Sequence, residues 1–204
     1  MTVPATTTPT RTLQIEFLFL DLDTCTRCHA TDATLLEAIE RTRPALDSAG
    51  VAVNITKTLV ASEAQAQALG FVSSPTIRIN GIDIAGELVE SACDSCSETC
   101  ACNGGVDCRD WLWQGERSHE PPLGLIVDAI MRHAGGTAPD SATSPPPRWG
   151  MVPANLRKYF AAAAADIPAA GCCAATDQVG CCDPEDKAGC CGEEVAAGGC
   201  GCHA

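Results

Sequence analysis

Fifteen cysteines in a chain of 204 residues constrain what this protein can fold into more than any other feature of its sequence. Thiols at this density belong either to exported domains held by disulfide bonds or to reduced intracellular proteins that handle redox equivalents or soft metals. The segment from Met1 to Thr12 is rich in Thr and Pro and lacks the basic start and apolar stretch of a secretory signal. The rest of the sequence contains no spanning segment. We therefore expect a cytoplasmic protein whose cysteines are mostly thiols.

The formal net charge of −13 narrows the range of partners. Nucleic acids and anionic membranes are bound by clustered Lys and Arg, so we expect neither as a partner. The same acidic field disfavours anions such as phosphate or arsenate and favours cations.

Apolar periodicity in the first part of the chain predicts strand, helix and strand. The residues of 13–20 alternate and then become apolar on both faces, which is typical of a strand with one fully buried end. A helical pattern follows Cys28, runs into Pro44 and ends by Gly50. Residues 51–55 alternate again as a second strand.

The next segment predicts a short helix and a hairpin. Ser62 with Gln65 three positions later is a capping-box signature, and Gly70 is well placed to end the helix. Asn80-Gly81 is a strong two-residue turn between apolar segments, so the strands within 76–84 should be antiparallel.

Periodicity is lost between Ala85 and Pro122, where five of the cysteines lie. Only the alternation of Trp111 and Trp113 around Leu112 suggests a short strand there. A last core helix is expected around 125–130, closed by Gly135-Gly136. The expected organisation is a disordered N-terminus (1–11), an α/β core domain (12–134) with a cysteine-rich insertion after its fourth strand (85–120), a linker (135–150), a short helix (151–170) and a largely disordered cysteine-doublet tail (171–204).

Cys25 and Cys28 form a Cys-x-x-Cys motif where the first strand runs into its helix. Unsatisfied N–H groups and the helix dipole favour a thiolate there, and Arg27 adds a positive charge. Cys25 is then the expected nucleophile and Cys28 the resolving thiol. The alternative is that this pair only ligates zinc.

The cysteines of the insertion are expected beside this pair. The first strand ends at the Cys25 edge of the sheet and the third begins there, so the antiparallel fourth strand returns the chain to that same edge. The insertion can supply relay thiols, join Cys25 and Cys28 in one thiolate-rich metal pocket, or hold its own structural zinc. The candidate ligands in the insertion are Cys93, Cys96, Cys100, Cys102 and Cys108.

The tail carries three cysteine doublets at a nine-residue spacing, each preceded by glycine. Adjacent Cα atoms are about 3.8 Å apart, shorter than the usual disulfide span, so pairing between doublets or metal ligation is more favourable than a bond within a doublet. Soft thiolates select Cu(I), Zn(II), Hg(II) or trivalent arsenic. A low-complexity tail without a ligand is the alternative. The candidate ligands in the tail are Cys172, Cys173, Cys181, Cys182, Cys190, Cys191, Cys200 and Cys202.

The order of elements, together with Cys25-x-x-Cys28 and Ser74-Pro75-Thr76, resembles the thioredoxin fold over about residues 12–134. In thioredoxin-like proteins this proline is cis and packs beside the redox cysteines, and the resemblance implies the same for Pro75. The segments 24–28 and 73–81, with Asp107-Cys108-Arg109 followed by Trp, are similar to a poorly characterised bacterial thioredoxin-like family that is associated with arsenic and mercury resistance.

Two functions follow as expectations. The first is a cytoplasmic thiol protein that binds and exchanges a soft metal or metalloid, As(III), Hg(II), Cu(I) or Zn(II), in resistance or homeostasis. The second is a thiol-disulfide oxidoreductase that reduces a protein partner, with the tail as electron relay. In both, Cys25 attacks, Cys28 resolves and Pro75 presents backbone to the substrate. The expected partner is a thiol reductant or a metal-handling protein.

Overall fold

The central sheet of the computed structural model contains four strands in the order β2-β1-β3-β4. They are β1 (Arg11–Phe19), β2 (Val51–Leu59), β3 (Thr76–Ile79) and β4 (Ile82–Asp83). β2 runs parallel to β1, whereas β3 is antiparallel to β1 and β4 is antiparallel to β3. The structure describes residues 11–93, 106–136 and 151–165, and the unit that ends at Ala162 holds almost all of them.

β1 is the centre of this sheet, with β2 on one side and β3 on the other. Its side chains are buried at alternate positions, Leu13, Ile15 and Phe17, and then consecutively at Leu18 and Phe19. The predicted change from one-sided to two-sided burial is therefore observed. The carboxyl end of β1 leads directly into the segment that carries Cys25.

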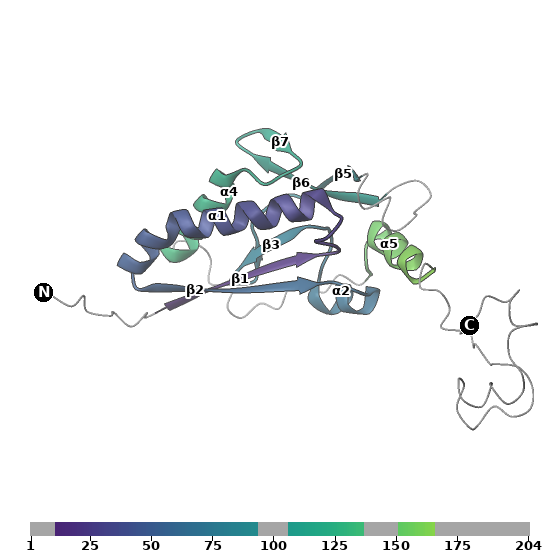
Figure 1. Ribbon diagram of the computed structural model, residues 1–204, viewed down its shortest axis with the longest axis horizontal. Coiled ribbons are helices and arrows are strands. Elements are labelled where there is room, and N and C mark those ends of the chain that lie inside the picture. Colours follow the sequence, from purple (N-terminus) through teal and green to yellow (C-terminus); the bar gives the residue numbers. More distant parts are fainter. Residues whose placement is uncertain (1–10, 94–105, 137–150, 166–204) are drawn as a thin grey trace, which may run out of the picture. The chain divides into compact units, whose positions relative to one another are not determined.

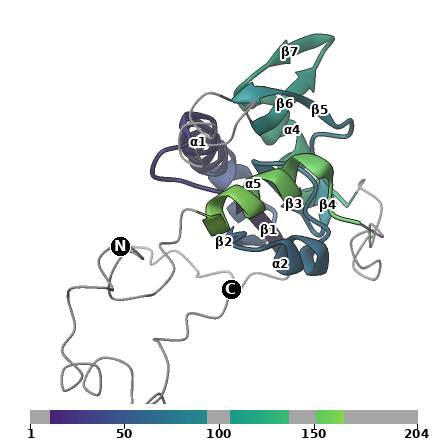
Figure 2. The same cartoon turned by 90° about the vertical axis from the view of Figure 1, so that its right-hand side faces the viewer.

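The helices lie on both sides of the sheet (Figures 1 and 2). Helix α1 (Thr26–Ser48) connects the parallel strands β1 and β2, and it packs beside α4 (Leu123–Ala134) on one face. Helix α2 (Glu63–Leu69) lies on the opposite side. None of the helices in the described ranges combines the length and the apolar character needed to cross a bilayer.

Two local predictions about chain reversals are confirmed. Ser62 caps α2, since its Oγ accepts the N–H of Gln65 at 3.2 Å, and Gly70 ends the helix with a left-handed φ of 58°. Asn80 and Gly81 have φ angles of 51° and 79° and join β3 to β4.

A second sheet lies within the segment where sequence periodicity is lost. It contains β5 (Val89–Cys93), β6 (Val106–Trp113) and β7 (Glu116–Ser118), and β6 is antiparallel to both neighbours. The sequence predicted only one short strand around Trp111 and Trp113. Four consecutive residues of β6, from Cys108 to Trp111, are buried, so this strand shows no alternation of apolar and polar residues.

Helix α5 (Ala154–Ala165) belongs to the same core, up to the end of the first unit. The apolar side chains that it and the segment just before it contribute to the core are Val152, Leu156, Tyr159 and Phe160. The predicted short helix is present at Ala154–Ala165, and residues 166–170 of the predicted range lie outside the described residues. Within the described residues the architecture is mixed α/β, with two sheets and four helices.

Candidate functional site

Cys25 is the N-cap residue of α1, and its Sγ accepts the backbone N–H of Cys28 at 3.4 Å. Asp21 shapes the preceding turn, since its Oδ1 accepts the N–H groups of Asp23 and Thr24 at 2.7 and 2.9 Å. The Cys25 sulfur therefore lies at the amino end of the helix, where N–H groups and the helix dipole stabilise negative charge.

Cys28 lies one turn into α1 and is wholly buried. A hydrogen bond with the Cys25 side chain, burial and negative charge on Cys25 all raise the pKa of the Cys28 thiol well above its usual value. Cys28 is therefore a protonated thiol at neutral pH. In this state it can donate its proton to the Cys25 sulfur.

The segment before β3 connects this pair to the second sheet. The Ser74-Pro75 peptide bond is cis. Ser74 Oγ lies 3.3 Å from Cys28 Sγ and accepts the N–H of Leu20 at 3.1 Å, while the Ser74 carbonyl accepts the N–H of Arg109 at 2.7 Å. Ser74, the residue before Pro75, thus contacts both Cys28 of the Cys-x-x-Cys motif and Arg109 of β6.

The sulfur atoms of Cys25, Cys93 and Cys108 all lie within 4.8 Å of one another, and we call these residues the three-thiol cluster. Their exposed fractions are 1%, 2% and 0%. Cys93 ends β5 opposite Val106, and Cys108 on β6 lies opposite Ser91, so the two cysteines are diagonal neighbours on one face of the strand pair. The structure records all three, and Cys28, as thiols and not as disulfides.

The juxtaposition expected from strand order is thus observed for two of the five insertion cysteines. The other three, Cys96, Cys100 and Cys102, lie outside the described residues. So do all the tail cysteines: Cys172, Cys173, Cys181, Cys182, Cys190, Cys191, Cys200 and Cys202.

Arg27 holds the Cys-x-x-Cys turn against the second sheet. Its buried guanidinium donates to Asp110 Oδ1 at 2.9 Å, to Ser91 Oγ at 3.0 Å and to the Ala92 carbonyl at 2.7 Å. The same group reaches the Cys108 carbonyl at 3.3 Å. Arg27 therefore binds to the two strands that carry Cys93 and Cys108, a role that its place in the motif did not reveal.

Asp110 is the fully buried acceptor of this network, and the sequence analysis missed it. Arg117 Nε donates to its Oδ2 at 2.7 Å, and His119 Nδ1 lies 2.8 Å from its Oδ1. Burial opposes ionisation, but hydrogen bonds from His119, Arg117 and Ser91 outweigh it and lower the pKa of the Asp110 carboxyl group. The sequence signal that could have pointed to Asp110 is its position between Cys108 and the two tryptophans that follow it.

Arg109 attaches the second sheet to the first. Its guanidinium is 2% exposed, pairs with Asp83 of β4 at 2.9 Å and lies 5.8 Å from the centre of the Trp111 ring. β6 thus presents Cys108, Arg109 and Asp110 in succession, and each contacts a different part of the core. The position of Cys108 is fixed by contacts on both sides of it along the strand.

Asn155 of α5 hydrogen-bonds to β6 at the residue before Cys108. Its side chain accepts the N–H of Asp107 at 3.0 Å and donates to the Asp107 carbonyl at 2.6 Å. It also donates to Glu90 Oε1 at 3.3 Å, which accepts a second hydrogen bond from Ser73. Helix α5 is therefore attached to both β5 and β6 next to the three-thiol cluster.

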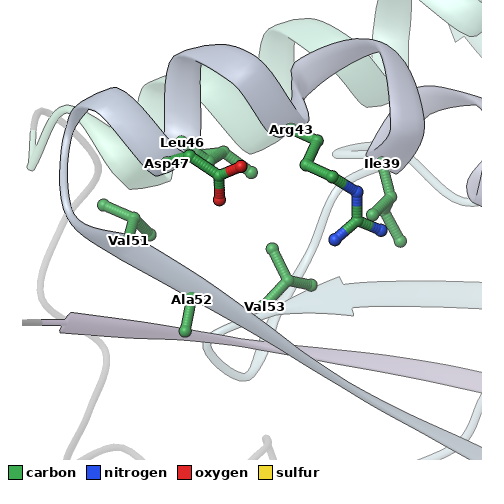
Figure 3. Close-up of a pocket in the computed structure, with 7 residues that line it drawn as sticks. All are labelled: Ile39, Arg43, Leu46, Asp47, Val51, Ala52 and Val53. Carbon is green, nitrogen blue, oxygen red and sulfur yellow. The ribbon is translucent and has the colours of Figure 1, made fainter. Parts of the chain in front are cut away.

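A shallow hollow of about 230 Å³ lies at the other end of α1, between that helix and β2 (Figure 3). It is roughly 16 Å or more along the helix axis from Cys28. Its lining contains neither thiol nor imidazole, so we assign it no chemistry. The lining residues are Ile39, Arg43, Leu46, Asp47, Val51, Ala52 and Val53.

Residues 13–130 match the family model of a domain of unknown function, DUF2703, which covers more than half of the chain. The protein belongs to this family. No curated protein and no solved structure gave a match. The DUF2703 match contains the three-thiol cluster, Cys28 and Asp110, whereas Asn155 and the rest of α5 lie outside it.

Proposed function

We propose that this DUF2703 protein binds a soft metal or metalloid ion through Cys25, Cys93 and Cys108 and exchanges it by thiol chemistry. The observation that supports this is the meeting of three buried sulfurs, from α1, β5 and β6, within 4.8 Å of one another. Thiolates select soft ions, of which As(III), Hg(II), Cu(I) and Zn(II) are the candidates.

The spacing of the sulfurs suits ligation after a small adjustment. Zinc–sulfur bonds of about 2.3 Å in tetrahedral geometry place two sulfurs about 3.8 Å apart. Rotation about the Cα–Cβ bonds moves a sulfur by more than the difference, so no rearrangement of the strands is required. The Cys28 thiol is hydrogen-bonded to Cys25. It can keep donating to the Cys25 sulfur when that sulfur also binds the ion.

Burial favours ion binding over reduction of a protein disulfide. A nucleophile that attacks a disulfide of another protein must reach its surface, and Cys25 is 1% exposed. An ion needs a far smaller opening. The oxidoreductase remains the second candidate, because the side chains of Cys25 and Cys28 are hydrogen-bonded to each other at the start of α1.

The thioredoxin-like fold is part of this proposal. The strand order β2-β1-β3-β4, the Cys-x-x-Cys turn at the start of α1 and the cis Ser74-Pro75 bond support it. Thiol ligands must stay reduced, so we propose the cytoplasm as the compartment and a thiol reductant or metal-handling protein as the partner.

The test compares the reduced full-length chain with Cys93→Ser and Cys108→Ser. Each protein is purified anaerobically from cells exposed to arsenite or zinc, challenged with a chelator and weighed by native mass spectrometry. We expect the unmodified chain to retain one more ion than either variant. Contributions of cysteines elsewhere are common to all samples and cancel in the difference.

The matched control is Val106→Thr, which also introduces a hydroxyl group at a buried position of β6 but removes no sulfur. It should retain the ion. Equal retention by the unmodified chain and both cysteine variants would refute ion binding at the three-thiol cluster.

A further inference from the structure

We infer that Cys25 is a shared sulfur, which either binds the ion together with Cys93 and Cys108 or forms a disulfide with Cys28, and cannot do both. Oxidation of the Cys25–Cys28 pair therefore releases the ion, and the bound ion protects the pair from oxidation. This inference rests on the proposed function and specifies how the three-thiol cluster is regulated. It follows from two sets of contacts made by one side chain.

The first set of contacts lies within the first turn of α1. Cys25 is the N-cap residue of this helix, and its Sγ accepts the backbone N–H of Cys28 at 3.4 Å. The two side chains are also hydrogen-bonded to each other. Two cysteines with this spacing at the start of a helix are typical of thiol pairs that alternate between dithiol and disulfide. Cys28 is therefore the expected disulfide partner of Cys25.

The second set of contacts lies between α1 and the second sheet. The Cys25 sulfur is within 4.8 Å of the sulfurs of Cys93 on β5 and Cys108 on β6. Arg27, in the same turn, donates hydrogen bonds to the Ala92 carbonyl on β5 and to the Cys108 carbonyl on β6, at 2.7 and 3.3 Å. The turn is thus held against both strands. Cys25 is the residue that belongs both to the Cys25–Cys28 pair and to the cluster.

The two roles of the Cys25 sulfur exclude each other chemically. A cysteine binds a metal through its thiolate, and a sulfur in a disulfide carries a second covalent bond in place of that negative charge. Oxidation of the pair would leave Cys93 and Cys108 as the remaining ligands of the cluster. Loss of a hydrogen-bond partner of a metal ligand already lowers metal affinity about 10–100-fold. Loss of a ligand itself should therefore lower the affinity by more than about a hundredfold.

Hydrogen peroxide is an oxidant whose small size suits this burial, since Cys25 and Cys28 are 1% and 0% exposed. The Cys25 sulfur attacks one peroxide oxygen, the O–O bond breaks, and a sulfenic acid and one water form. The Cys28 sulfur then attacks the Cys25 sulfur, the S–O bond breaks, and the disulfide and a second water form. The two thiols lose two electrons, the peroxide gains two, and both thiol hydrogens leave in the water. A bound ion occupies the Cys25 sulfur and so prevents the first step.

The test measures the Cys25–Cys28 disulfide directly. The reduced full-length chain, either free of ions or saturated with arsenite or with Zn(II), receives a short pulse of hydrogen peroxide that is ended by catalase and alkylation. Trypsin cleaves after Arg27, between the two cysteines, and residues 12–41 contain no other cysteine. Peptides 12–27 and 28–41 therefore stay linked only where this disulfide has formed, and mass spectrometry quantifies the linked product.

The rates with and without ion are compared within each protein. Cys93→Ser and Cys108→Ser keep the Cys25–Cys28 pair but lack the complete cluster, whereas Val106→Thr keeps both. Ions bound by cysteines elsewhere are common to all samples, so the cluster alone distinguishes them. Native mass spectrometry counts the ions in the same loaded samples, and circular dichroism and thermal unfolding verify that each variant folds.

The ion retained at the cluster should slow disulfide formation at least about tenfold in the unmodified chain and in Val106→Thr, because an ion at about 100 times its Kd leaves only about 1% of the clusters free. The rate in Cys93→Ser and Cys108→Ser should not change with ion. An ion retained at the cluster without slowing the reaction would overturn this inference and leave the proposed function standing. So would a disulfide from Cys25 to Cys93 or Cys108 in place of Cys28. If the loaded unmodified chain retains no more ion than the cysteine variants, both fail.

Discussion

Arg27 of α1 and Asp110 of β6 form a buried ion pair, with 2.9 Å between Nη1 and Oδ1. The pair connects the turn that carries Cys25 to the strand that carries Cys108. The distance between the sulfurs of the three-thiol cluster therefore depends on two residues that are not themselves ligands. Removing either partner should affect both folding and ion binding.

The first prediction concerns Asp110→Asn. The substitution leaves Arg27 buried without a carboxylate, and breaking a buried pair in this way costs about 3 kcal/mol. We expect a loss of this size in the free energy of unfolding, measured with denaturant, and weaker retention of the ion. Asp128→Asn is the control, because the Asp128–Arg132 pair is exposed and should contribute less than about 0.5 kcal/mol. Equal losses in the two variants would contradict a structural role for the buried pair.

The second prediction follows from the lowered pKa of Asp110. A carboxylate whose pKa is lower in the folded state contributes stability that is fully present above its unfolded pKa, about 3.9, and is lost as the pH falls through the folded value. The stability difference between the unmodified chain and Asp110→Asn should therefore persist down to about pH 5 and shrink below about pH 4. Unfolding free energies measured across this range check it. A difference that grows on acidification would show the opposite sign.

The third prediction separates the two proposed functions at Cys28. Its sulfur is not a member of the three-thiol cluster, but it hydrogen-bonds to Cys25, so Cys28→Ser should weaken ion binding by no more than about tenfold, or about 1.4 kcal/mol. Disulfide reduction should be lost completely, because no resolving thiol remains. Cys25→Ser should lose both activities. Ion binding and the reduction of a small disulfide are measured on the same samples, and loss of the ion in Cys28→Ser as complete as in Cys108→Ser would require a four-sulfur site.

Sequence patterns predicted the elements of the first sheet, because each has one dominant local signal. Ser62 and Gly70 bound α2, and Asn80-Gly81 fixes the hairpin. The second sheet was largely missed. In β6, Arg109 and Asp110 are buried together with Trp111. Local periodicity cannot reveal this burial, because the two charged side chains pair with Asp83 and Arg27, which are distant in sequence.

The candidate site was predictable to the level of strand order only. The predicted strand order placed the insertion at the edge of the sheet near Cys25. It could not indicate which of the five insertion cysteines, namely Cys93 and Cys108, would lie beside Cys25. That choice depends on register: Cys93 opposes Val106 and Cys108 opposes Ser91, which sets both sulfurs on one face. Arg27 hydrogen-bonds to both strands and so stabilises this register.

The fourth prediction concerns the contact between Gly124 and Trp113. A Cβ at Gly124 would lie 2.3 Å from the Trp113 ring, so the ring must move. Gly→Ala in a helix is ordinarily stabilising, but here overpacking should destabilise the protein by about 1–3 kcal/mol. Trp113→Leu should relieve the clash, so the double variant should be more stable than the sum of the single changes predicts. Additive effects in this cycle would contradict the contact.

The last prediction tests whether α5, which lies outside the family match, limits access to the three-thiol cluster. Asn155→Ala removes both hydrogen bonds to Asp107, next to Cys108. Because water can reach Asp107, the cost in global stability should be only about 1 kcal/mol. The local effect should be larger, since the end of β6 then opens more often, and the ion should transfer to a chelator several-fold faster. Asn54→Ala, which removes an exposed hydrogen bond to Gln14 in the first sheet, should leave the transfer rate unchanged. Equal rates in the two variants would mean that α5 does not control access to Cys108.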